Sequence, residues 1–163
     1  MKIAIIGAGN LGLSIAKGLI INNTYTDLYL TKRNLDTIRE FEEYKSVFLT
    51  TNNNEAIKNA DILIFAVQPS QFESILNEVK PHLNEKHVII STITGFPISR
   101  IETQISSDYP IIRAMPNTAI SVAKSMTCLC SNQEGESKLP IAEAIFNGLG
   151  TNLIIEEELM QAA

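Results

Sequence analysis

Three glycines near the start of the chain have the spacing of a phosphate-binding loop. Gly7, Gly9 and Gly12 form the pattern G-x-G-x-x-G, which follows an apolar run and precedes a helical pattern over residues 11–21. In such a loop the first glycine permits a tight turn, the second lets the backbone approach a pyrophosphate, and the third lets the helix pack closely. Backbone N–H groups and the helix dipole then hold the phosphates. We therefore predict dinucleotide binding; the alternative is a glycine-rich turn in an ordinary βα unit.

Two basic residues bear on which dinucleotide would bind. The strand expected over residues 27–31 ends at Lys32 and Arg33, and no acidic residue stands at this end. An acid here would bind a ribose 2′-hydroxyl, whereas a guanidinium suits a 2′-phosphate through paired hydrogen bonds. The pattern therefore favours NADP over NAD. The alternative is a solvated charge pair at a helix start, with Asn34 as the N-cap.

Further candidate binding positions fall at the ends of other expected strands. Asn53 lies in a run of asparagines after a strand expected over residues 47–50, where the adenosine half of a dinucleotide would lie. A plain loop with an N-cap explains that run equally well. The nearly continuous apolar segments 60–67 and 88–93 are typical of parallel strands covered on both faces. Their ends should open onto the crevice where such sheets bind ligands.

The cysteines and histidines indicate no second chemistry. Cys128 and Cys130 lie two residues apart on an expected strand, which indicates buried free thiols rather than a disulfide, a redox pair or a metal site. His82 and His87 flank a turn, and we expect both at the surface. No other metal-binding residue recurs at a useful spacing, so we expect no metal.

The elements that must position these residues form an α/β fold. Apolar segments alternate with helical patterns, and the last of them are a strand over residues 125–130, a helix over 139–149 and a strand over 151–155. This order predicts a Rossmann-like, doubly wound, mainly parallel sheet with helices on both faces. We expect residues 1–155 to form one NAD(P)-binding domain.

The bulk composition narrows the class of protein. The chain has 163 residues, of which 45% are hydrophobic, enough for one domain with a sizeable core. The net charge of -5 and the lack of a basic stripe argue against a nucleic-acid partner. The apolar runs are far shorter than the roughly 20 residues that span a bilayer, so we expect no membrane span. No signal peptide fits the start, and we expect a cytoplasmic protein.

Taken together, the motifs resemble those of pyrroline-5-carboxylate reductase, the enzyme of the last step of proline synthesis. The resemblance runs along essentially the whole chain and is carried by residues 6–12, 66–69, 91–95 and 113–118. Many dehydrogenases share the glycine loop, but A-V-x-P and R-x-M-P-N-T at these spacings make the match specific. Residues 157–162 look like the start of that family's long interdomain helix.

The resemblance implies an oxidoreductase that passes hydride from NADPH, or alternatively NADH, to the C=N carbon of a small cyclic imine, Δ1-pyrroline-5-carboxylate, giving L-proline. It also implies a set of cofactor-binding residues. These are Ile6, Gly7, Ala8, Gly9, Asn10 and Leu11 over the pyrophosphate, with Gly12 behind them; Lys32 and Arg33 at the ribose phosphate; Asn53 at the adenosine; Ala66, Val67, Gln68, Pro69, Ile93, Thr94 and Gly95 on the nicotinamide side; and Asn117 and Thr118 near the reacting ring.

The family's second, all-helical domain makes the dimer and supplies most of the substrate pocket. We expect that domain to be missing here, with residues 156–163 as the start of the interdomain helix. No catalytic residue is assigned, and we expect the chain alone to bind NADP(H) but to reduce the imine poorly. The full-length protein would be a homo-oligomer through the missing domain. Two alternatives stay open: a related NADP-dependent oxidoreductase, of the F420-dependent NADP reductase or β-hydroxyacid dehydrogenase type, and a non-catalytic dinucleotide-binding module.

Overall fold

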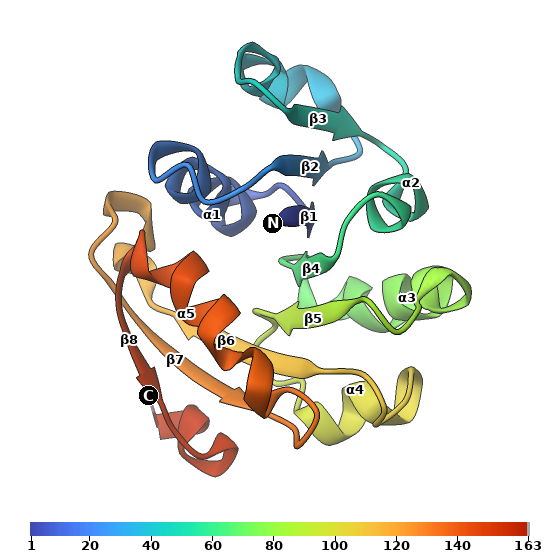
Figure 1. Ribbon diagram of the computed structural model, residues 1–163, viewed down its shortest axis with the longest axis vertical. Coiled ribbons are helices and arrows are strands. Elements are labelled where there is room, and N and C mark those ends of the chain that lie inside the picture. Colours follow the sequence, from blue (N-terminus) through green and yellow to red (C-terminus); the bar gives the residue numbers. More distant parts are fainter. Residues whose placement is uncertain (163) are drawn as a thin grey trace.

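An eight-stranded sheet forms the centre of the molecule in the computed structural model, which describes residues 1–162 (Figure 1). Its order is β3-β2-β1-β4-β5-β6-β7-β8. The strands are β1 (Lys2–Ile6), β2 (Asp27–Thr31), β3 (Val47–Thr50), β4 (Ile62–Phe65), β5 (Val88–Ser91), β6 (Ile111–Pro116), β7 (Ser125–Ser131) and β8 (Gly150–Ile154).

The direction of the strands places one set of strand ends together. Strands β1 to β6 are mutually parallel, whereas β7 runs antiparallel to β6 and β8 runs parallel to β7. The carboxyl ends of β1 to β6 therefore share one edge of the sheet. The chain moves outward from β1 in one direction to β3 and then in the other from β4, so a crevice is expected between β1 and β4 at this edge. The predicted doubly wound, mainly parallel sheet is confirmed.

Helices cover both faces of the sheet (Figure 1). One face carries α1 (Asn10–Ile21), α5 (Leu139–Asn147) and the 3-10 segments η1 (Leu35–Glu43) and η3 (Thr118–Val122). The other carries α2 (Asn53–Lys58), α3 (Pro69–Val79), α4 (Ile98–Gln104), η2 (Lys80–His82) and η5 (Glu157–Ala162). A short 3-10 turn, η4 (Glu136–Lys138), leads into α5.

The alternation of side chains along β1 explains why its sequence is apolar throughout. Ile3 and Ile5 pack in the core under α1 and α5, while Ala4 and Ile6 pack in the core under the opposite helices. All four are fully buried, as expected for a central parallel strand covered on both faces. This strand is the rigid base from which the glycine loop begins.

Two expectations about single residues have different outcomes. Cys128 and Cys130 are buried free thiols, as predicted. The expectation that His87 lies at the surface is wrong, because its side chain is fully buried. Its Nε2 lies 3.0 Å from the carbonyl oxygen of Ile57, and its Nδ1 accepts a hydrogen bond from the backbone N–H of Asn84 at 3.1 Å. A neutral imidazole thus joins the turn before β5 to α2.

The end of the chain folds back over the sheet. Residues 157–162 form η5, and Met160 is buried against the core under α4. Ala163, the last residue of the helix start expected from the sequence, lies outside the described residues. Across residues 1–162, no helix combines the length and the apolar character needed to cross a lipid bilayer. The same part of the chain brings no three His, Cys, Asp or Glu side chains together as a metal site.

Candidate functional site

The three glycines of the loop differ in what surrounds them. Gly7 has a φ of +97°, and a Cβ there would lie 2.6 Å from Cγ1 of Val67. A Cβ at Gly12 would collide with the carbonyl oxygen of Gly7. A Cβ at Gly9 would meet no atom within 4 Å. Gly7 and Gly12 are therefore required by the packing of the loop itself, whereas Gly9 faces open space that a ligand could fill.

The first turn of α1 presents unused backbone donors. Gly9 is its N-cap and makes no side-chain cap bond, and no acidic side chain stands in the first turn. The first helical bond runs from the N–H of Leu13 to the carbonyl of Gly9 at 2.8 Å. Within the described residues, the N–H groups from Gly9 to Gly12 have no protein acceptor. Free donors at the positive end of a helix dipole suit an anion such as a pyrophosphate.

A cavity of about 740 Å³ connects the loop with the ends of β2, β3 and β4. Of the residues predicted to bind a cofactor, it brings together Gly7, Ala8, Gly9, Lys32, Arg33, Asn53, Ala66, Val67 and Gln68. Asn10, Leu11 and Gly12 follow directly in α1, while Ile6 is buried in β1 and Pro69 is the first residue of α3. The cavity is of the size that small-molecule and cofactor sites usually have.

Lys32 and Arg33 stand at this cavity without acidic partners. No carboxylate in the described part of the chain lies within 4.0 Å of either side-chain cation. The nearest acid along η1, Asp36, instead pairs with Arg39 at 2.7 Å. Asn34 accepts a hydrogen bond from the N–H of Asp36 at 3.1 Å, so the predicted N-cap also forms. The positive charge of this strand end is therefore open to a phosphate.

One wall of the cavity consists of residues that were not predicted from the sequence. Five residues of α3 line it, Ser70, Gln71, Ser74, Ile75 and Glu78, as do Thr31, Asn34 and Thr51. The spacing of the five α3 residues places them on one helical face. A mostly polar helical face is ordinarily solvent-exposed, so the pattern alone did not distinguish a cavity wall from a surface.

The other candidates for the nicotinamide side and the reacting ring do not line the first cavity. Thr94 and Gly95 line a second cavity of about 470 Å³, together with Arg113 and residues of η5. Ile93 is buried, and its N–H lies 3.3 Å from the hydroxyl of Ser91. Asn117 caps η3 by accepting a hydrogen bond from the N–H of Ala119 at 3.1 Å, and neither it nor Thr118 lines either cavity. None of these five residues lines the cavity that contains the glycine loop.

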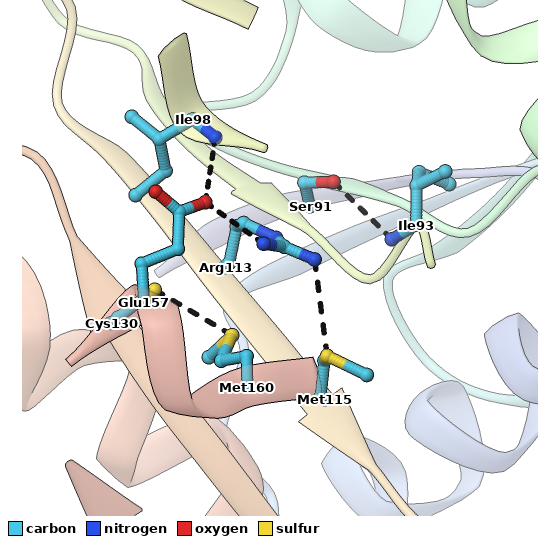
Figure 2. A network of polar contacts seen from close by, with 8 residues as sticks. All are labelled: Ser91, Ile93, Ile98, Arg113, Met115, Cys130, Glu157 and Met160. Atoms are coloured by element: carbon cyan, nitrogen blue, oxygen red, sulfur yellow. Dashed lines mark hydrogen bonds and ion pairs between the residues drawn. The ribbon is translucent and has the colours of Figure 1, made fainter. Parts of the chain in front are cut away.

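A partly buried ion pair, shown in Figure 2, is formed by two residues that line the second cavity. Nη1 of Arg113 donates to Oε1 of Glu157 at 2.8 Å, and the same oxygen accepts from the N–H of Ile98 at 2.7 Å. Nε of Arg113 is buried and has no partner. Nearby, Sγ of Cys130 lies 3.6 Å from Sδ of Met160. Burial, and secondarily the Glu157 carboxylate, raises the pKa of Cys130 to about 11, so this thiol is a poor nucleophile.

Comparison with known families identifies the protein family to which this chain belongs. A family model described as "NADP oxidoreductase coenzyme F420-dependent" matches residues 2–95, more than half of the chain. This chain belongs to that family. The matched segment begins at β1 and ends at Gly95, so it includes the glycine loop, the basic pair and every residue that lines the first cavity.

Curated relatives extend the likeness beyond the matched segment. Pyrroline-5-carboxylate reductase 2 of Dictyostelium discoideum is 36% identical over 99% of this chain and 60% of the relative. Pyrroline-5-carboxylate reductase 1 of the same organism is 38% identical over 96% of this chain and 31% of the relative. The chain therefore spans between about a third and three-fifths of the length of these two reductases.

Solved structures agree on the fold. A pyrroline-5-carboxylate reductase from Coxiella burnetii has a TM-score of 0.92 and 32% identity, covering 98% of this chain and 61% of that one. The Plasmodium falciparum enzyme, solved with NADP bound, has a TM-score of 0.85 and 26% identity, covering 98% of this chain and 59% of that one. The Rossmann-like fold is thus confirmed, and so is the predicted resemblance to pyrroline-5-carboxylate reductases along nearly the whole chain.

Proposed function

We propose that this chain is the NADPH-binding domain of a pyrroline-5-carboxylate reductase. The observation that carries the proposal is the pairing, in one cavity, of free α1 amides with the unpaired cations of Lys32 and Arg33. The amides suit the pyrophosphate, and the cations suit the ribose 2′-phosphate. The NADP-bound Plasmodium falciparum relative and the identity to reductases over nearly the whole chain support it.

In this proposal the domain orients the cofactor. NADPH supplies the hydride that adds to the C=N carbon of the imine, whose nitrogen takes up a proton to give proline. The residues of this chain hold the pyrophosphate and the ribose 2′-phosphate, and Thr94 and Gly95 lie toward the nicotinamide. Fixing the cofactor in this way lowers the barrier by orientation rather than by covalent chemistry. No residue of the described part of the chain is assigned as a proton donor.

The whole reaction is proposed for a longer protein. Because the chain spans at most three-fifths of the Dictyostelium reductases, we assign nucleotide binding to these residues and imine reduction to an enzyme that also carries the remaining length. Residues 156–163 would begin the helix between the two parts, and the full-length enzyme would be a homo-oligomer. The cytoplasmic location stays a prediction, supported by two cysteines that are free thiols.

A nucleotide titration tests the proposal. We expect wild type to bind NADPH more tightly than NADH. Arg33→Ala should weaken NADPH binding by about 10- to 100-fold, since a hydrogen bond to a charged group contributes roughly 1.5–3 kcal/mol, and leave NADH binding unchanged. Arg39→Ala is the matched control, because Arg39 pairs with Asp36 and lies outside the cavity. Binding of neither nucleotide by wild type would refute the cofactor assignment.

An activity assay of the full-length enzyme tests the substrate. We expect NADPH-dependent reduction of Δ1-pyrroline-5-carboxylate to proline. The second candidate is exchange of reducing equivalents between coenzyme F420 and NADP, which the description of the matching family favours. Activity with F420 and none with the imine would replace the first proposal by the second. NADPH binding with neither activity would favour a non-catalytic module.

A further inference from the structure

We propose that Thr31 is a positioning residue for the glycine loop: its hydroxyl fixes the first amide of the loop, so that the following amides face the pyrophosphate. This proposal rests on the proposed nucleotide binding. Thr31 is the last residue of β2, is 2% exposed, and lines the first cavity. Dinucleotide-binding domains often carry an acid near this strand end, which binds ribose. In this chain the side chain turns to the loop instead.

Two hydrogen bonds join Thr31 to the loop. The N–H of Gly7 donates to Oγ1 of Thr31 at 3.1 Å, and the N–H of Ala8 donates to its carbonyl oxygen at 2.8 Å. The second bond continues the parallel pairing of β1 with β2, in which Ile6 pairs with Thr31, and any residue could accept it. The first bond depends on the side chain, because only a hydroxyl or another short acceptor reaches the Gly7 amide from this position.

These bonds divide the amides of the loop into two groups. The N–H groups of Gly7 and Ala8 are used by Thr31, whereas those of Gly9, Asn10, Leu11 and Gly12 have no acceptor in the described part of the chain. The bonded amides end, and the free amides begin, where the loop passes from β1 into α1. Gly7 has a φ of +97°, and glycine can adopt several other backbone conformations at little cost. A hydrogen bond that fixes the Gly7 amide therefore limits the directions that the following N–H groups can take. Thr31 therefore orients the free N–H donors toward the pyrophosphate site before a nucleotide binds.

Hydrogen exchange in the wild-type protein gives a test without any substitution. In the nucleotide-free protein, we expect the amides of Gly7 and Ala8 to exchange at least tenfold more slowly than those of Asn10 and Leu11. Addition of NADPH should then slow the exchange of Asn10 and Leu11 most. If the Gly7 amide exchanges as fast as that of Asn10 before nucleotide is added, the proposal is overturned.

Substitutions of Thr31 test the side chain itself. Thr31→Val keeps the shape and removes the hydroxyl; we expect it to weaken binding of NADPH and NADH by the same factor, about tenfold, since one lost hydrogen bond is of that order. Thr31→Ser keeps the hydroxyl and should restore wild-type affinity. Thr26→Val is the matched control directly before the opposite end of β2, where the hydroxyl accepts a hydrogen bond from the N-terminal amine.

A third probe separates positioning from general destabilisation. 2′-AMP carries the 2′-phosphate but no pyrophosphate, so Thr31→Val should leave its affinity within twofold of wild type, while Arg33→Ala weakens it. Equal loss for 2′-AMP and NADPH in Thr31→Val would show a merely structural role and overturn the proposal. Unchanged NADPH affinity in Thr31→Val would overturn it too, with nucleotide binding by wild type still standing.

Discussion

Arg113 and Glu157 form a salt bridge across 44 residues of sequence, with Nη1 and Oε1 2.8 Å apart. Their side chains are 7% and 31% exposed, whereas each side chain in the other ion pairs of residues 1–162 is at least 45% exposed. Glu157 also accepts from the N–H of Ile98 at the start of α4. One carboxylate therefore connects η5, β6 and α4 (Figure 2). The ion pair shares the second cavity with Thr94 and Gly95.

Removing the charge of Glu157 should destabilise the fold. For Glu157→Gln we expect the free energy of unfolding to fall by about 1–3 kcal/mol, below the range for fully buried pairs because Glu157 is partly exposed and the amide still accepts from Ile98. Chemical denaturation measures this. Glu158→Gln, at an exposed neighbour, should stay within about 0.5 kcal/mol of wild type. Equal effects of the two substitutions would contradict a structural role of the pair.

Alanine at two glycines of the loop should separate binding from folding. Gly9→Ala adds a methyl group where no atom lies within 4 Å, so we expect an unchanged melting temperature and at least a tenfold loss of NADPH affinity. Gly12→Ala drives a methyl group into the carbonyl of Gly7, so we expect a loss of about 2 kcal/mol or more in stability. Calorimetry and titration measure both. Full NADPH affinity in Gly9→Ala would place the pyrophosphate elsewhere.

Acid should destabilise the protein through His87. Burial lowers the pKa of this imidazole, and protonation of Nδ1 would break its bond from the Asn84 N–H. The unfolded state, with a pKa of about 6.5, binds the proton more readily than the folded state, so stability is retained above that pH and falls below it. Unfolding free energies between pH 7.5 and 5 should therefore decline as the pH is lowered.

Variants of the two histidines test whether His87 causes the decline in stability at low pH. In His87→Gln the slope between pH 7.5 and 5 should be smaller than in wild type, even though the variant is less stable overall. His82→Gln, at the half-buried histidine five residues earlier, is the matched control. If His82 and His87 variants change the slope equally, burial of His87 does not control it.

The two thiols should be unreactive in the folded protein. Cys128 and Cys130 are buried, and burial raises the pKa of Cys130 to about 11, which leaves very little thiolate at pH 8. With a chromogenic disulfide reagent we expect no rapidly reacting thiol in the native state and two after addition of guanidinium. A thiol that reacts in the native state as fast as free cysteine would contradict this burial.

Local patterns were enough to predict most of the framework. The apolar run before Gly7 and the bounds of β2 and β3 depend on nearest neighbours and strand composition, and the structure has them where they were expected. The cluster of Gly7, Arg33 and Val67 in one cavity also follows from parallel strand order, which brings strand ends together.

Features that depend on distant contacts were not predictable in this way. His87 is buried because α2, 30 residues earlier, supplies a carbonyl acceptor, and a single histidine near a turn carries no sign of that contact. In the sequence, the α3 residues that line the cavity have the pattern of an ordinary solvent-exposed polar face. Asn117 and Thr118 stay predicted cofactor residues, because neither lines either cavity and their predicted place beside the reacting ring depends on contacts with the nucleotide itself.

The position of β1 between β2 and β4 has a consequence for synthesis of the protein. Residues 2–6 leave the ribosome before the other strands, but one side of β1 stays without its partner until residues 62–65 have emerged. Val67, which packs against Gly7, comes later still. Because domains gain their order as contacting segments become available, the glycine loop cannot be complete until Val67 has emerged, about 60 residues after Gly7. A nascent chain halted before β4 should thus have no nucleotide affinity, and one halted just after α3 should begin to acquire it.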